Sequence, residues 1–145
     1  MDYIKQLSQK AKAQSVENLV QKQYLNNENW IRETIKDRWK TGKTPNGDLI
    51  GFYRSEPYAL DKSKQNSFAG FGNVDLILTG SLWKGIQIDF TSQTQAEVFS
   101  TDSKFDDISD KYGDYNFNLS VKEQEWLDEM IFNEVLSIML KNTYE

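Results

Sequence analysis

The sequence contains no histidine, no cysteine and only two prolines among its 145 residues. Histidine is the side chain that most readily transfers protons near neutral pH, and it is the commonest metal ligand. Without histidine and cysteine, Ser-His-Asp and Cys-His catalysis, zinc-thiolate sites and disulfides are excluded. Carboxylates, Lys, Tyr and Ser remain, as does a metal held by oxygen ligands. The absences suit a protein with no cofactor, no metal site and no enzymatic activity, which is what we expect.

Long apolar runs are also lacking. The longest ones, such as Leu76-Ile77-Leu78 and Met130-Ile131-Phe132, are far shorter than the roughly 18 residues of a membrane span. The first residues do not form the apolar run of a signal peptide. We therefore expect a protein that has no membrane partner and stays where it is made, free or within a particle assembled there.

Aromatic residues, in contrast, are abundant. The chain has 4 Trp, 7 Tyr and 8 Phe, although apolar residues make up only 38% of it and the mean hydropathy is −0.69. The length suits one domain with one core, and so many aromatic residues argue against intrinsic disorder. A thin core with many large aromatic residues favours a subunit that neighbouring chains help to stabilise.

The charge is unevenly distributed along the chain. Residues 1–73 carry 12 Lys and Arg against 8 Asp and Glu, whereas residues 74–145 carry 5 against 14. One interpretation is that the two halves fold together and place different charges on different faces. The other is head-to-tail association, in which the basic side of one copy meets the acidic side of the next and the copies close into a ring.

The patterning predicts a single α+β domain over residues 1–145. Long N-terminal helices and a C-terminal helix are expected to pack on a small antiparallel sheet, with a long central loop. The expected segments are a helical arm (1–25), a helix (26–42) capped by Asn27 or Asn29, an extended loop (43–73) in which Glu56-Pro57 keeps the chain extended, a β-hairpin region (74–100), an acidic linker (101–119) and a C-terminal helix (120–142).

Three local signals support these assignments. Ile86, Ile88 and Phe90 alternate with polar residues, which is typical of a half-buried strand. Within the acidic linker, the spacing of the apolar residues indicates a two-turn helix that ends at Gly113. Ser120-Val121-Lys122-Glu123 has the form of a capping box at the start of the C-terminal helix.

Two groups of residues are candidates for contacts with other chains. The first consists of aromatic residues placed in the loop or away from the centre of the apolar stripe of the C-terminal helix, namely Phe68, Phe71, Trp126 and Phe132. The second is the acidic cluster Asp102, Asp106, Asp107 and Asp110. Its spacing does not match a calcium-binding loop. We expect this cluster either to line a channel or to meet Lys and Arg of an adjacent subunit.

Four short segments stand out by their order and spacing: a Gly-x-Tyr turn, a Val-Asp-Leu segment leading to Thr-Gly-x-Leu, a linker ending in Tyr-Gly, and a Ser-x-x-Glu box. Their characteristic residues are Gly51, Tyr53, Asp75, Thr79, Gly80, Leu82, Lys104, Tyr112, Gly113, Ser120 and Glu123. Together they resemble the phage virion-morphogenesis proteins of the head–tail connector, the tail-completion and neck-ring proteins. They are most similar to virion proteins of Bacteroides-type crAss-like phages. The resemblance covers roughly residues 30–135.

This resemblance implies a structural subunit of a ring that stacks below the portal, commonly in about twelve copies. The implied partners are copies of the chain, the portal, other connector or tail proteins, and phage DNA that passes through the channel without sequence-specific binding. The implied location is the virion, assembled in the host cytoplasm. The chain departs from the tail-completion pattern in its long segment 43–73 and in lacking a basic, proline-containing run after Tyr112-Gly113.

Two other functions compete with this one. The chain could be a small soluble adaptor or binding module unrelated to phages. It could also be a muralytic enzyme that uses a pair of carboxylates. The helical acid pairs available for such an enzyme are Glu33 with Asp37, and Glu125 with Asp128 or Glu129. Each pair has the spacing of an ordinary solvated helix face.

Overall fold

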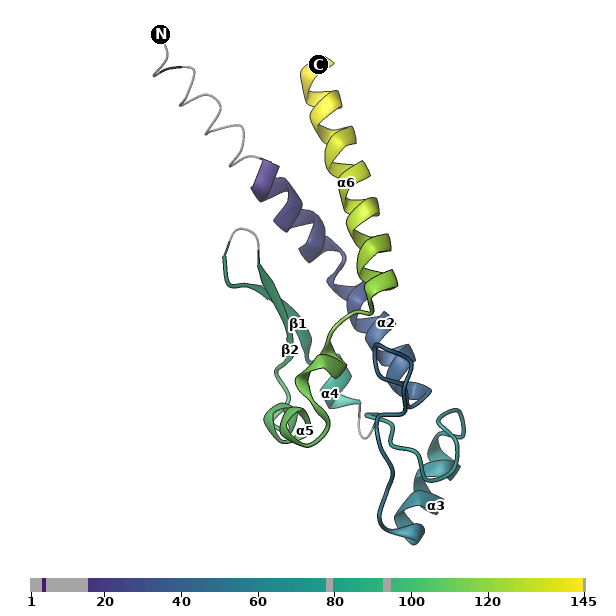
Figure 1. The fold of residues 1–145 in the computed structure, drawn as a ribbon. Coiled ribbons are helices and arrows are strands. Elements are labelled where there is room, and N and C mark those ends of the chain that lie inside the picture. The colour runs from purple at the N-terminus through teal and green to yellow at the C-terminus, as the bar shows by residue number, and fades with distance from the viewer. Residues whose placement is uncertain (1–3, 5–15, 78–79, 93–94, 145) are drawn as a thin grey trace.

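A computed structural model describes residues 4, 16–77, 80–92 and 95–144, and it shows the expected α+β fold with one small antiparallel sheet (Figure 1). Residues 16–26 are helical, and most of the predicted arm before them lies outside the described residues. The elements that follow are α2 (Glu28–Lys40), α3 (Glu56–Gln65), α4 (Ser81–Lys84), β1 (Ile86–Phe90), β2 (Ala96–Ser100), α5 (Phe105–Tyr112), the 3-10 helix η1 (Asp114–Phe117) and α6 (Val121–Tyr144).

The predicted hairpin is confirmed. β1 and β2 pair antiparallel, with Ile86 opposite Ser100 and Phe90 opposite Ala96. Ile86 and Ile88 are buried, whereas the residues between and after them are exposed, so the alternation in the sequence matches the two faces of the strand. The turn is closed by the N–H of Thr91, which donates to the carbonyl of Gln95 at 3.0 Å.

Helix α2 holds the other edge of β1 through side chains. Glu28 Oε2 accepts the N–H of Ile88 at 3.1 Å, and Arg32 Nη2 donates to the carbonyl of Ile86 at 2.8 Å. Glu28 and Arg32 also form an ion pair with each other, one turn apart. These contacts satisfy backbone groups that a two-stranded sheet would otherwise leave open.

The core lies where α2, the hairpin, η1 and the first half of α6 meet. Its fully buried centre is Trp39 and Phe117, whose rings pack edge to face with centroids 5.0 Å apart. The indole N–H of Trp39 donates to the carbonyl of Asn116 at 2.9 Å. Ile31 and Ile35 of α2 join the same cluster, together with Leu127, Ile131 and Val135 of α6. The core is small, as the composition suggested.

The segment 43–73 is not a continuous loop, and this prediction was wrong. It contains α3, which begins after Ser55, whose hydroxyl accepts the N–H of Tyr58. Pro57 lies in the first turn, where a helix does not use its N–H groups internally, so Glu56-Pro57 starts a helix rather than keeping the chain extended. The rest of the segment is anchored by isolated bridges, such as the one between Phe52 and Asn73.

The ends of the other helices follow the predictions more closely. The expected helix over 26–42 is α2, and Asn27 lies at its N-cap position, but the Asn27 amide donates to the carbonyl of Gln23 and does not cap α2. The predicted helix in the acidic linker is α5, and it ends at Gly113, where φ is 96°. Helices α4 and η1 were not predicted because four residues carry too little periodicity.

Helix α6 begins with the predicted capping box. The N–H of Ser120 donates to Glu123 Oε1 at 2.9 Å, and the N–H of Glu123 donates to the Ser120 hydroxyl at 3.2 Å. Residues 16–26 and α6 extend on the same side of the molecule from the rest of the fold (residues 28–120), which we call the body (Figure 1). Tyr24 and Asp128 link these two helices by a hydrogen bond between their side chains.

Candidate functional site

The exposed aromatic residues predicted for partner contacts lie in two separate places. Phe68 and Phe71 are in the loop after α3 and are 70% and 61% exposed, and Lys40 lies 4.8 Å from the ring centre of Phe68. Phe132 is on α6 and is 65% exposed. Trp126 is half exposed because its ring stacks on Trp30 of α2 at a centroid distance of 4.8 Å.

Phe132 belongs to a larger apolar surface on the second half of α6, which we call the α6 stripe. Its members are Phe132, Leu136 and Leu140, all more than 40% exposed. The core-facing residues Leu127, Ile131 and Val135 occupy a different face. At 100° per residue, the stripe is centred more than 90° away from that face. The second half of α6 is therefore apolar on two faces, only one of which the described residues cover.

A second surface feature is a cavity of about 600 Å³ between the turn at 51–55, the start of α3, α4 and α5. We call it the cationic cavity because three cations line it, Arg54, Lys104 and Lys111. Its walls also carry the aromatic rings of Phe52, Tyr53, Tyr58 and Tyr112. Tyr53 and Tyr58 pack edge to face at 4.9 Å, and the Lys111 ammonium lies 5.2 Å from the ring centre of Tyr112.

Several residues that carry the resemblance to connector proteins meet in this cavity. Tyr53, Asp75, Leu82, Lys104 and Tyr112 all line it, although they come from three different segments of the sequence. Gly51 lies behind it, where a side chain would approach the Tyr112 ring to 3.3 Å. Thr79 lies outside the described residues, and Gly80, with φ of 86°, starts α4.

A buried ion pair supports one wall of the cavity. Lys62 Nζ lies 2.7 Å from Asp75 Oδ1, and the side chains are only 5% and 2% exposed. Asp75 also accepts from the Asn66 amide at 2.8 Å and from the N–H of Ile77 at 3.1 Å, and Lys62 donates to the carbonyl of Ile77. The hydroxyl of Tyr53 lies 3.3 Å from the backbone of Asp75, and burial raises the pKa of this tyrosine well above its usual value.

The acidic cluster does not form a single site. Asp106, Asp107 and Asp110 are exposed on α5 and do not line the cationic cavity. Asp102 precedes α5, and its Oδ1 accepts the N–H of Lys104 at 2.8 Å. The pKa of Asp102 is lowered first by a hydrogen bond from Ser81 and then by that from Lys104. Asp102 therefore stabilises the turn before α5.

The segment between α5 and α6 is fastened to α2 by Arg38, which the sequence did not single out. Arg38 donates to Glu123 Oε1 at 2.8 Å and to the carbonyl of Asn116 at 3.1 Å, and its guanidinium also bonds the carbonyl of Asn118. Burial lowers the pKa of Arg38, although the charge of Glu123 opposes this shift. Ser120 and Glu123 thus have a structural role at the start of α6.

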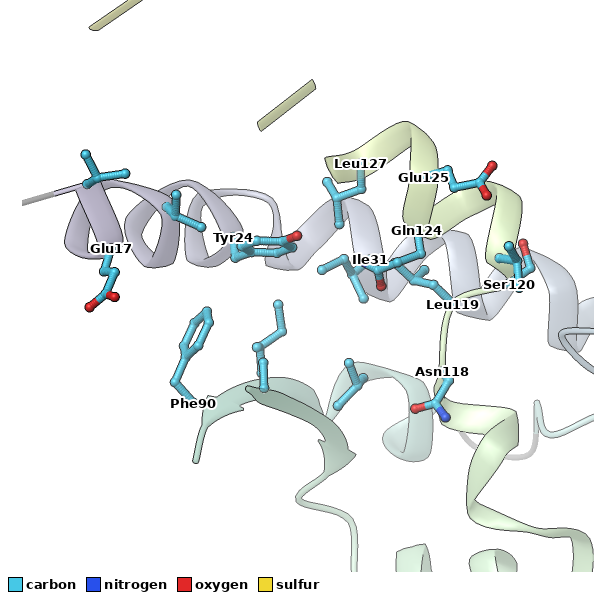
Figure 2. A pocket seen from close by; sticks show the side chains of 16 residues that line it. Glu17, Tyr24, Ile31, Phe90, Asn118, Leu119, Ser120, Gln124, Glu125 and Leu127 are labelled. Atoms are coloured by element: carbon cyan, nitrogen blue, oxygen red, sulfur yellow. The ribbon is translucent and has the colours of Figure 1, made fainter. Parts of the chain in front are cut away.

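Figure 2 shows a third feature, an apolar groove of about 770 Å³. Tyr24 from the N-terminal helix, Phe90 from β1 and Leu127 from α6 face this common space. Glu17 and Glu125 are the charged residues at its rim. The tyrosine hydroxyl bonds Asp128, and burial, followed by this carboxylate, raises the pKa of Tyr24.

The carboxylate pairs considered for an enzyme have ordinary surroundings. Glu33 forms an ion pair with Lys36 at 2.8 Å, and Asp128 also accepts from the Gln124 amide at 2.8 Å. Asp37, Glu125 and Glu129 are exposed. The described residues include no group of three or more acidic side chains arranged to bind a metal ion. Within the same residues, no helix has the length and apolar content to span a membrane.

Comparison with known proteins adds no relative. No family model, no curated protein and no solved structure matches the chain.

The sequence analysis missed the α3 residues at the cationic cavity and did not group the α5 residues as one helix face. Lys62 and Tyr58 belong to α3, which was not predicted. Lys104, Ile108, Lys111 and Tyr112 recur at the i, i+4, i+7 and i+8 spacing of one helix face, and all four line the cationic cavity. That spacing can be read from the sequence. It would have distinguished this helix face from the one that carries the exposed aspartates of α5.

Proposed function

We propose that this chain is a structural virion protein. In this proposal it is a subunit of a ring in the head–tail connector or neck of a tailed phage, below the portal, and it forms part of the channel through which DNA passes. Its partners are copies of itself and neighbouring connector or tail proteins. The single observation that carries the proposal is the α6 stripe, an apolar helix face that the described chain does not cover.

The energetics of this stripe favour association. Burying a Leu or Phe side chain contributes about 1.5–3 kcal/mol, so covering Phe132, Leu136 and Leu140 contributes several kcal/mol to an interface. Helix α6 has 24 residues and is therefore about 36 Å long, which lets its second half reach a neighbouring chain. A helix that is apolar on more than one face is normally buried on each of them.

The resemblance to connector proteins gives the kind of assembly. The residues that carry it come together around the cationic cavity and at the start of α6, and are not scattered over the fold. Such clustering is expected if this chain and the connector proteins have the same fold. The number of copies, commonly about twelve in such rings, rests on the resemblance alone.

Sedimentation velocity and negative-stain imaging of the purified chain test the proposal. We expect ring-shaped oligomers of the full chain. The double variant Phe132→Gln with Leu136→Gln should shift the protein to monomers, while its circular dichroism stays that of the wild type. The control Ser137→Gln with Lys141→Gln introduces the same residues on another exposed face of α6 and should leave the rings intact. A wild-type chain that stays monomeric at every concentration would contradict the proposal.

The alternative function, a small adaptor, is favoured by one observation, the apolar groove of Figure 2. A groove of this size between helices suits an apolar segment of another protein. The same measurements separate the two functions. An adaptor is a monomer whose groove binds a ligand, and its oligomeric state does not change when the α6 stripe is made polar.

A further inference from the structure

Helix α5 carries opposite charges on two faces. Lys104, Ile108, Lys111 and Tyr112 face the cationic cavity. At 100° per residue these four positions span about one third of the helix circumference. Asp106 and Asp110 fall on the other side of the helix, Asp107 lies beside them one turn before Lys111, and all three are exposed. We call these three residues the acidic face of α5.

The cationic cavity has a surplus of positive charge. Arg54, Lys104 and Lys111 line it, and the one carboxylate among its described lining residues is Asp75. That carboxylate is already paired with the buried Lys62. Asp102 offsets part of the surplus, because its carboxylate interacts electrostatically with the charge of Lys104. In a chain of net charge −5, this cavity is therefore a local site for an anion.

We propose that the cationic cavity receives the acidic face of α5 from the next copy of the chain. This inference rests on the proposed ring assembly and names the contact that sets its register. Each copy then offers the cavity on one side and the acidic face on the other. A contact between two different surfaces is the kind that closes copies into a ring when the rotation allows it.

The spacing of the charges suits this contact. Asp106 and Asp110 are one helical turn apart, about 6 Å. Lys104 and Lys111 are two turns apart, about 10 Å, so the lysines can bracket the two carboxylates. Tyr58 and Tyr112 also line the cavity, and a tyrosine hydroxyl can donate a hydrogen bond to a carboxylate. Arg54 supplies a further donor at the exposed rim.

Charge reversal on either side tests the contact by sedimentation velocity at low and moderate salt. Variant A carries Asp106→Lys and Asp110→Lys, and variant B carries Lys104→Glu and Lys111→Glu. In each variant like charges face each other between copies, so we expect self-association to weaken at least about tenfold. Wild-type association should weaken with added salt, because exposed charge contacts are screened.

An equimolar mixture of A and B provides the decisive measurement. Lysines on the altered face of A then meet glutamates in the cavity of B, and the unaltered aspartates of B meet the unaltered lysines of A. We expect the mixture to regain wild-type association with alternating copies. A single chain with all four substitutions should also assemble, since its two surfaces are complementary again.

Matched controls keep the net charge change while avoiding both surfaces. Asp37→Lys with Asp61→Lys is the control for A, and Lys64→Glu with Lys122→Glu is the control for B. Both should assemble like the wild type. If A and B form rings as well as their controls do, the inference is wrong while the proposed ring function stands. If the wild type never assembles, both are wrong. Circular dichroism checks folding, and Lys104→Ala with Lys111→Ala replaces B if B is unfolded.

Discussion

At the scale of single residues, the carboxylate of Asp75 is the charged group that depends most on its buried partners. It is almost fully buried, and it is satisfied by an ammonium, an amide and a backbone N–H. A buried carboxylate is tolerated only with such a set of partners. Removing one partner leaves the other charge uncompensated, so the pair is costly to break even though its net contribution to stability is modest.

We therefore expect Asp75→Ala to lower the free energy of unfolding by about 3–5 kcal/mol, because it leaves the Lys62 ammonium buried without a counter-charge. Urea denaturation followed by circular dichroism measures this change. Glu33→Gln is the control, since it removes the partly exposed ion pair with Lys36 and should cost less than about 1 kcal/mol. Equal effects of the two substitutions would show that the burial of the Lys62–Asp75 pair has no energetic weight.

The sequence analysis selected Asp75 as one of the residues that carry the resemblance, but it did not predict its ion pair with Lys62. Lys62 lies 13 positions earlier in the sequence and reaches Asp75 because it lies on α3. This helix begins with Glu56-Pro57, a pair that predicts extended chain. Arg38 was missed for a similar reason. Its acceptors are backbone carbonyls more than 75 positions away, and no local pattern encodes them.

At the scale of elements, several signals contained within a few residues are confirmed, although Glu56-Pro57 and the Asn27 cap are not. The alternation in β1, the capping box of α6 and the glycine that ends α5 all depend on local backbone geometry, and the structure confirms them. The site features depend on how elements meet. The cationic cavity combines a turn, the segment 74–76 and three helices, so periodicity can group its α5 residues but not the others.

At the start of α6, one carboxylate oxygen accepts a hydrogen bond from a neighbouring residue and another from a residue far away in the sequence. Glu123 Oε1 accepts both the N–H of Ser120 and the guanidinium of Arg38. We expect Glu123→Ala to lower the free energy of unfolding by about 2–3 kcal/mol, because it removes a helix cap and leaves a half-buried cation unpaired. Chemical denaturation tests this value.

Glu129→Ala, an exposed position on the same helix, is the control for the capping substitution, and it should change stability by less than about 0.5 kcal/mol. A Glu123→Ala variant that is as stable as Glu129→Ala would mean that Arg38 finds an equivalent partner elsewhere.

At the scale of the whole molecule, the first and second halves of α6 differ in how many of their side chains are buried. Leu127 and Ile131 are packed in the core, whereas the side chains of residues 136–141 are mostly exposed. Segments with few buried contacts open at low free energy. We therefore expect the outer part of α6 to gain order in the proposed assembly.

Hydrogen exchange can follow this difference along α6. In the monomeric Phe132→Gln, Leu136→Gln variant, we expect amides of residues 137–144 to exchange faster than those of residues 124–131. In the assembled wild type the outer amides should become protected, while those of α2 stay unchanged. Equal protection along α6 in the monomer would contradict the view that the body alone supports only its first half.

The stacked indoles of Trp30 and Trp126 have an optical consequence. With centroids 4.8 Å apart and planes inclined by 29°, two of the four tryptophans are close enough for their electronic transitions to couple. Since one ring belongs to α2 and the other to α6, the coupled signal exists only while these helices are docked. The protein thus contains a label-free reporter of the joint between its body and its projecting helix.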